Sequence, residues 1–179
     1  MSTYTTPDFL DDSTCNYILS ELSGFRFPWY YNRSVASPDG NDGFMFGHQF
    51  QDDGGICSNG FDRIVKPILD KAGIVQEKVL RVKANLYTNQ GKAIVHDWHV
   101  DQIPHGERYH TAFGILLYNV TTNNGYTELK TGEKFPSNRN EAIFFDGKVI
   151  HRSVTQTDTY TRLNININYE YPNSTTPTE

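Results

Sequence analysis

The hydrophobic period of the chain changes near Val79, and this change limits the possible folds more than any other feature. From there to about residue 171, apolar and polar residues alternate with a period of two, which is typical of β-strands with one buried face. No segment with the period and length of a helix interrupts the series. Because parallel strands need long and usually helical crossover connections, the pattern favours an antiparallel sandwich or barrel.

Turn signals separate the individual strands. After the first strand we predict strands over the ranges 94–101, 111–120, 126–130, 142–145, 149–155 and 161–171. The turn residues between several of them are Asn123-Asn124-Gly125, Pro136-Ser137-Asn138 and Asp146-Gly147.

The first and last of these strands have a polar face and an apolar face. The polar set of the first strand is Arg81, Lys83, Asn85 and Tyr87, and that of the last is Arg162, Asn164, Asn166 and Asn168. If the polar faces point into the barrel, the apolar faces of the same strands must be covered by other elements outside it. The alternative is a sandwich whose polar faces are simply solvated.

The N-terminal half provides that cover, because it contains two amphipathic helices. Asp11, Asp12 and Ser13 are N-cap candidates for the first helix, which Gly24 ends. The second runs over 61–69 with Pro67 as a possible kink, and Gly73 stops it. Short strands are predicted over 25–32 and 44–50, with Gly/Asp-rich loops after each. We predict one domain over residues 1–171 and a flexible tail over 172–179.

Composition excludes some classes of partner. A chain of 179 residues with 37% hydrophobic residues suffices for one core, and a net charge of -5 makes nucleic acid an unlikely partner. The N-terminus does not have the pattern of a signal peptide, and no apolar run approaches the ~20 residues that a membrane span needs. We therefore predict a soluble, cytoplasmic protein with its two cysteines reduced and no membrane association. The sequence does not indicate an oligomeric state.

A candidate metal site begins with His99 and Asp101. Residues i and i+2 of a strand share a face, so both side chains can reach one ion. The third ligand must come from another strand, and His151 is the best-placed imidazole downstream. Two histidines and one carboxylate describe the facial triad of non-haem Fe(II) oxygenases. The alternative is a structural histidine at 99 that bonds to Asp101.

Several other residues are candidates for the metal site or for its surroundings. His96 is the main competitor as a ligand, but a regular strand would place it on the face opposite His99. Arg162 offers a fixed cationic fork for a carboxylate, and Asn85 with Tyr87 adds hydrogen-bonding groups. We interpret Asp97 as solvated and Arg152 as structural. The remaining histidines are predicted to lie on the surface: His48, His105 and His110.

Taken in order, these motifs resemble the Fe(II)/2-oxoglutarate-dependent oxygenase superfamily, especially its prolyl-4-hydroxylase-like and phage-type members. The similarity covers about 79–169, roughly half of the chain. The residues that carry it are Asn85-Leu86-Tyr87, His99-Val100-Asp101, Leu117-Tyr118-Asn119, Gly125-Tyr126-Thr127-Glu128, Ala142-Ile143-Phe144-Phe145-Asp146-Gly147, His151-Arg152 and Arg162-Leu163-Asn164.

The resemblance implies a mainly β (α+β) fold, a double-stranded β-helix or jelly-roll with its core at about 79–171 and the two N-terminal helices outside one sheet. It implies that His99, Asp101 and His151 bind Fe(II), and that Arg162 pairs with the distal carboxylate of 2-oxoglutarate. Tyr87 and, more weakly, Asn85 are implied as further contacts, and Asn164 stands where some relatives have serine. Tyr87 lies farther from His99 than the family pattern predicts, and Gly125-Tyr126 replaces a usual glycine pair.

The implied function is that of a dioxygenase with Fe(II), 2-oxoglutarate and O2, which hydroxylates a protein side chain such as proline or a small metabolite and releases succinate and CO2. Because Asp101 is retained, hydroxylation is favoured over halogenation. The alternative is a cupin-like metal- or ligand-binding module without turnover. The segments that could form the mouth of the site are 29–31, 37–43, 51–60, and Trp98 with 102–109.

Overall fold

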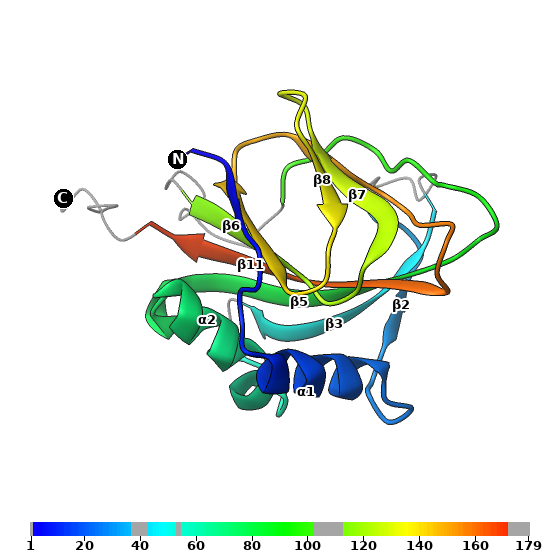
Figure 1. Ribbon diagram of the computed structural model, residues 1–179. Helices are drawn as coiled ribbons and strands as arrows, with labels where there is room; N and C mark the ends of the chain where they lie inside the picture. Colours follow the sequence, from blue (N-terminus) through cyan, green and yellow to red (C-terminus); the bar gives the residue numbers. More distant parts are fainter. Residues whose placement is uncertain (1, 37–42, 53–54, 102–112, 172–179) are drawn as a thin grey trace.

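The computed structural model describes residues 2–36, 43–52, 55–101 and 113–171. Its strands form two antiparallel sheets that lie one above the other, and α1 (Asp12–Ser23) and α2 (Lys66–Ala72) lie beneath the larger sheet (Figure 1). The predicted tail at 172–179 lies outside the described residues. None of the described helices is both long and apolar enough to cross a membrane.

The larger sheet contains strands from both the N-terminal and the C-terminal part of the chain. Its strand order is β1 (Tyr4–Thr6), β9 (Glu141–Asp146), β6 (Phe113–Asn119), β11 (Thr161–Glu170), β5 (Val79–Thr88), β3 (Met45–Asp52) and β2 (Tyr30–Asn32), and β4 (Gly55–Ile56) pairs with β3. The long strands β11 and β5 pair in the middle, where Arg162 lies opposite Tyr87 and Asn164 opposite Asn85. The two polar faces predicted from the sequence therefore form one continuous surface.

The smaller sheet has the order β10 (His151–Val154), β7 (Asn123–Leu129) and β8 (Lys134–Ser137). Two turn predictions were wrong here, because Asn123-Asn124-Gly125 begins β7 and Pro136-Ser137 ends β8. Proline is tolerated in β8, which is an edge strand in the described part of this sheet. A register shift between Asn123 and Tyr126 absorbs the irregular start of β7.

The strand predicted over 94–101 is not a regular strand. This segment touches β10 through two isolated bridges, Val95 with Val154 and His99 with His151. Between the bridges it has one residue more than β10, so a continuous ladder cannot form and the alternation of side chains shifts by one position. The segment runs beside β10 and places His99 in the space between the sheets.

The helices follow the sequence prediction closely. Asp11 caps α1 by accepting a hydrogen bond from the Thr14 amide at 3.0 Å. The second helix begins as a π-helix, η1 (Phe61–Val65), continues as α2, and ends at Gly73 with a left-handed φ of 67°. Pro67 lies in the first turn of α2, where proline is accepted, so it produces no kink within that helix. A short 3-10 helix, η2 (Gln76–Lys78), leads into β5.

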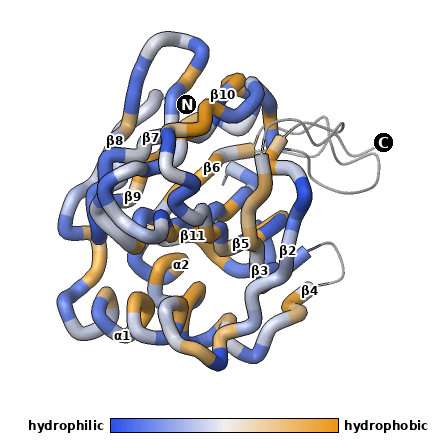
Figure 2. Tube along the Cα trace, turned by 90° about the vertical axis from the view of Figure 1, so that its right-hand side faces the viewer, coloured by the Kyte–Doolittle hydropathy of each residue, from blue (hydrophilic) through white to orange (hydrophobic). Residues whose placement is uncertain are grey.

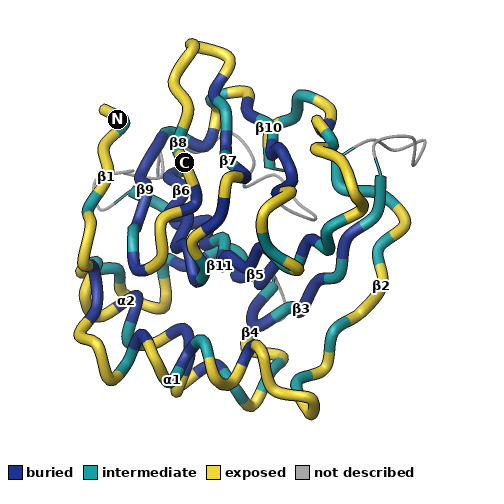
Figure 3. The backbone as a smooth tube through the Cα atoms, turned by 45° about the vertical axis from the view of Figure 1, so that its right-hand side comes forward, coloured by how far each residue is buried: buried dark blue, intermediate teal, exposed yellow. Residues whose placement is uncertain are grey.

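The main core lies between the helices and the outer face of the larger sheet. The apolar residues of β5 and β11 pack there against helix residues such as Ile18, Leu22, Ile64 and Ile68, all at most 1% exposed. Figure 2 shows hydrophobic residues recurring along α1 and α2, and Figure 3 shows buried residues along β3, β5 and β11 above them. The prediction of a jelly-roll with helices outside one sheet is confirmed, and the polar face is left to line the interior.

Candidate metal centre

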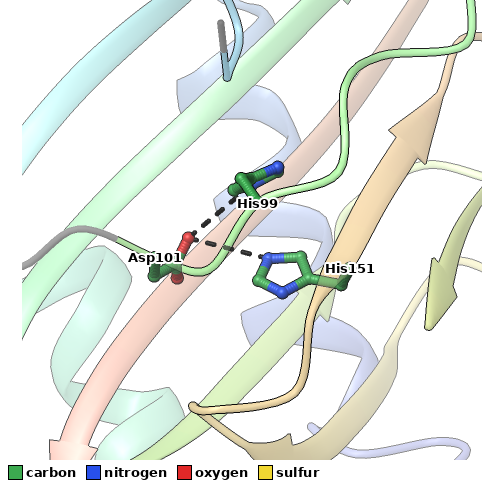
Figure 4. A group of neighbouring side chains, drawn as sticks. All are labelled: His99, Asp101 and His151. Carbon is green, nitrogen blue, oxygen red and sulfur yellow. Dashed lines mark ion pairs between the residues drawn. The ribbon is translucent and has the colours of Figure 1, made fainter. Parts of the chain in front are cut away.

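Three side chains meet at one point, two from the 94–101 segment and one from β10, and they are the predicted triad (Figure 4). One potential ligand atom each from His99, Asp101 and His151 lies within 4.8 Å of the others. Asp101 Oδ1 is 4.0 Å from His99 Nε2 and 3.7 Å from His151 Nε2. The backbones of the two histidines exchange hydrogen bonds of 2.9 Å in both directions, which fixes their separation.

Backbone carbonyls orient both imidazoles. His99 Nδ1 lies 3.1 Å from the Asp97 carbonyl oxygen, and His151 Nδ1 lies 3.0 Å from that of Val149. A carbonyl can only accept, so in each neutral imidazole Nδ1 carries the proton and Nε2 keeps its lone pair. Both lone pairs are available to a metal ion on the side where Asp101 lies.

The two oxygens of the Asp101 carboxylate face different groups. Oδ2 accepts hydrogen bonds from Asn166 Nδ2 at 2.8 Å and Asn168 Nδ2 at 2.7 Å, and it pairs with Arg81 Nη2 at 3.2 Å. Oδ1 faces the histidines. Burial opposes the charge of this carboxylate, but the nearby His151, the charge of Arg81 and the hydrogen bond from Asn168 outweigh burial and hold its pKa well below the usual range. Two neutral imidazoles and one oriented carboxylate could hold a divalent transition metal.

The triad opens into a cavity of about 610 Å³ between the sheets. Three apolar side chains, Ile115, Leu117 and Phe145, form one wall. The polar lining includes Tyr87 and the Asn85–Asn164 pair, in which Asn85 Nδ2 donates to Asn164 Oδ1 at 2.9 Å. The other lining residues are Val35, Ala36, Met45, Arg81, Lys83, Val100, Thr127, Ser153 and Asn166.

Arg162 lies behind this lining and is 1% exposed. Its Nε donates to Ser137 Oγ at 2.7 Å, and its Nη2 donates to Thr127 Oγ1 at 3.0 Å. Its Nη1 donates to the carbonyl oxygens of Tyr126 and Val154, both at 3.2 Å. Among the residues that the structure describes, no carboxylate pairs with this guanidinium. Burial lowers the pKa of Arg162, yet the group remains cationic, and one Nη2 hydrogen has no acceptor among the described residues.

Two predictions about histidines need correction. His96 does not face away from the site: the extra residue before His99 turns it inward, where it is 2% exposed and its Nδ1 lies 2.6 Å from Ser153 Oγ. His48 is not on the surface, because it is buried between the Pro28 carbonyl oxygen and Ser58 Oγ, at 2.8 and 2.7 Å. His105 and His110 lie outside the described residues.

Other assignments can be compared with the structure directly. Asp97 is exposed, as predicted. Arg152 pairs with Glu128 at 2.7 Å and lies over the Trp98 ring at 4.1 Å, which agrees with a structural role. Trp98 therefore packs under Arg152 and does not line the cavity. The segment 29–31 does not line it either, and of the predicted mouth the ranges 37–42, 53–54 and 102–109 lie outside the described residues.

Sequence reasoning missed the residues that hold the triad in place. Arg81, Asn166 and Asn168 were recognised only as members of polar strand faces. A signal was present, because these faces repeat polar residues where a packed core would have apolar ones. What the pattern could not supply was the pairing of Asp101 with Asn168, since that depends on how the two sheets face each other.

Comparison with known proteins supports the fold. No protein-family model matches the sequence, and no curated protein matches it either. Among solved structures, the viral collagen prolyl hydroxylase of Paramecium bursaria Chlorella virus-1, solved with 2-oxoglutarate, superposes with a TM-score of 0.56 at 14% identity, over 94% of this chain and 95% of that one. A prolyl hydroxylase of Trichoplax adhaerens, solved with a hypoxia-inducible-factor peptide, gives 0.63 at 14% identity, over 94% and 83%.

The same fold also accommodates other chemistry. The non-haem α-ketoglutarate-dependent epimerase SnoN from nogalamycin biosynthesis superposes with a TM-score of 0.60 at 15% identity, over 94% of this chain and 78% of that one. Identities this low establish the fold alone. The protein thus has the double-stranded β-helix fold of the 2-oxoglutarate/Fe(II) oxygenases, and at the level of the fold the similarity to their prolyl-4-hydroxylase-like members is confirmed.

Proposed function

We propose that the protein is a 2-oxoglutarate-dependent Fe(II) dioxygenase that hydroxylates a carbon of a protein side chain, such as proline, or of a small metabolite. The observation that carries this proposal is that one cavity has an oriented His-Asp-His triad on its wall and, behind it, a buried guanidinium that pairs with no carboxylate of the described residues. A triad alone fits many metal proteins. A buried cation without a carboxylate partner indicates an anionic ligand in the same cavity.

The residues present fit Fe(II). His99 and His151 would supply Nε2 and Asp101 would supply Oδ1, while Oδ2 stays with its three protein donors. Bound iron, with 2-oxoglutarate and O2, would supply the oxidant, and succinate and CO2 would be released. Because Asp101 fills a coordination position that a halide would need, hydroxylation is favoured over halogenation.

The co-substrate would lie between the triad and Arg162. The free Nη2 hydrogen of Arg162 would meet its distal carboxylate, with the hydroxyls of Thr127 and Tyr87 as further donors. The Asn85–Asn164 pair forms part of the adjacent wall. Ile115, Leu117 and Phe145 line the same cavity, and apolar side chains of this kind would strengthen nearby polar contacts by lowering the local dielectric constant.

The experiment that tests this function is an anaerobic titration with Fe(II) and 2-oxoglutarate, followed by exposure to oxygen. We expect a metal-to-ligand charge-transfer band in the ternary complex, and succinate after oxygen is admitted. Absence of both would favour the cupin-like binding module. The charge-transfer band without succinate, tested against peptides and metabolites, would favour another reaction on the same site.

Metal binding is expected to tighten as the pH rises through the pKa of His151. Burial alone would lower that pKa, but the Asp101 carboxylate, whose Oδ1 lies 3.7 Å from His151 Nε2, favours the protonated imidazole and raises it above its ordinary value. Below this pKa the metal must displace one proton, so its Kd should fall about tenfold per pH unit and level off above it. Anaerobic Fe(II) titrations between about pH 6 and 9 measure this slope. A Kd that does not change over this range would contradict the assignment of His151.

Asn168→Ala is expected to weaken Fe(II) binding by about 10- to 100-fold, because the amide group holds Asp101 Oδ2 at 2.7 Å. The matched control is Asn85→Ala, which removes an amide group from the same cavity on the side away from Asp101. Its Fe(II) affinity should stay within about twofold of the unmodified protein. Equal losses in both variants would mean that the effect comes from general disturbance of the sheet.

A further inference from the structure

A second cation lines the cavity, and neither the triad nor the co-substrate contacts proposed above use it. Lys83 lies on β5 between Arg81 and Asn85, and its side chain is half-buried in the cavity wall. Its ammonium group lies 3.9 Å from Met45 Sδ, which is a weak acceptor. In the part of the chain that the structure describes, no carboxylate pairs with it, whereas Arg81 pairs with Asp101 at 3.2 Å.

The neighbouring strand is shaped to hold this lysine. A Cβ added to Gly47 on β3 would lie 2.6 Å from Lys83 Cε and 3.4 Å from its Nζ. Gly47 has no positive φ, so its backbone does not require glycine. The absence of a side chain at Gly47 is explained instead by the lysine stem that lies across it. A side chain at Gly47 would displace the end of Lys83 from its place in the wall of the cavity.

An ammonium group in this position costs stability unless something compensates it. Burial and the charge of Arg81, opposed only in part by the charge of Asp101, lower the pKa of Lys83 to about 8. A methionine or leucine would fill the same volume without that cost. The lysine is explained if a ligand of the cavity brings the missing negative charge.

That ligand is distinct from the co-substrate held by Arg162. On the paired strands, Arg162 lies opposite Tyr87, and Lys83 lies opposite Asn166, which holds Asp101. The Lys83 side chain extends away from β11, because its ammonium group lies near Met45 Sδ and next to Gly47 on β3. Arg162 belongs to β11, on the other side of β5, so the two cations lie on different sides of that strand.

From this arrangement we infer that the substrate is a small carboxylic acid of about amino-acid size, whose carboxylate pairs with Lys83 while a carbon nearby faces the triad. This inference rests on the proposed function. It narrows the class of substrate from protein side chains and small metabolites to free carboxylic acids. The cavity volume of about 610 Å³ lies within the range of small-molecule sites.

The test is calorimetric titration of the protein loaded anaerobically with Fe(II) and 2-oxoglutarate. The probes are the free proteinogenic L-amino acids and short aliphatic monocarboxylic acids, each compared with its methyl ester. At least one free acid should bind, and its ester should bind at least about tenfold more weakly because it lacks the charge. Lys83→Met should weaken the acid about tenfold or more and leave the affinity for 2-oxoglutarate within about twofold, and Lys83→Arg should retain part of the binding.

Two further variants separate position from charge. Lys92→Met removes an exposed cation elsewhere on the chain and should change neither affinity. Gly47→Ala keeps the ammonium group but displaces it, and it should weaken the acid as well. Only those Lys83 variants that thermal melting shows to be folded enter the comparison with the unmodified protein.

Several results would overturn the inference: equal affinity for acids and esters, unchanged acid binding by Lys83→Met, or no binding of any free acid to protein that binds 2-oxoglutarate. Loss of 2-oxoglutarate affinity in Lys83→Met would also overturn it, because the lysine would then hold the co-substrate. Failure of the unmodified protein to bind 2-oxoglutarate would contradict the proposed function instead. The comparison of acids with esters, repeated without co-substrate, would then still decide the role of Lys83.

Discussion

Asp101→Ala is expected to abolish Fe(II) binding and all succinate formation. The substitution removes one of three ligands, so the loss in metal affinity should exceed the roughly 10- to 100-fold expected when only a partner of a ligand is removed. It also leaves the donors of Arg81, Asn166 and Asn168 without their shared acceptor in a buried site. Anaerobic Fe(II) titration and succinate release measure the first effect, and thermal melting measures the second.

Asp97→Ala is the matched control, because it removes an exposed carboxylate from the same segment. This variant should bind iron and turn over like the unmodified protein. Asp101→Asn adds a second comparison, since its amide keeps the shape of the carboxylate but loses the charge. If Asp101→Ala still binds iron within about tenfold of the unmodified protein, the ligand set must be revised.

Arg162→Met is expected to raise the 2-oxoglutarate concentration needed for half-saturation by about 10- to 100-fold while iron still binds. A charge-assisted hydrogen bond contributes about 1.5–3 kcal/mol, which corresponds to that range. The measurement is the charge-transfer band as a function of 2-oxoglutarate under anaerobic conditions. Arg152→Met is the control, because Arg152 follows His151 directly but pairs with Glu128 on the smaller sheet.

Arg162 also donates four hydrogen bonds to protein acceptors, so its loss will lower the melting temperature. Arg162→Lys keeps a cation in the same place and should recover part of the co-substrate affinity. Unchanged affinity in a folded Arg162→Met variant would mean that another residue holds the distal carboxylate.

Much of the fold could be predicted because the residues that pack in the core recur at regular intervals in the sequence. The alternation along β5 and β11 indicated a polar interior and an apolar back, and the stripes of the two helices indicated what covers it. The pairing of His99 with Asp101 also followed from strand geometry, whereas His151 was chosen as an imidazole on a later predicted strand and through the family resemblance. The periodic features depend on neighbours two to four residues apart, which a single sequence contains.

The features that were missed depend on contacts between distant segments. The extra residue between Val95 and His99 is visible only against β10, and it reverses the face on which His96 lies. His48 looked isolated in the sequence, but its partners come from a loop and from the segment after β4. The partners of Asp101 come from strands that begin far away in the chain.

The extra residue in the 94–101 segment also affects how this protein can associate with other chains. A regular edge strand offers a continuous row of amide and carbonyl groups onto which another chain can add. Here β10 is bordered by a segment that is bridged at only two points, and β8, at the other end of the described sheet, contains Pro136. Neither border provides an unbroken template, so the geometry that places the metal ligands also protects the smaller sheet from strand-by-strand aggregation.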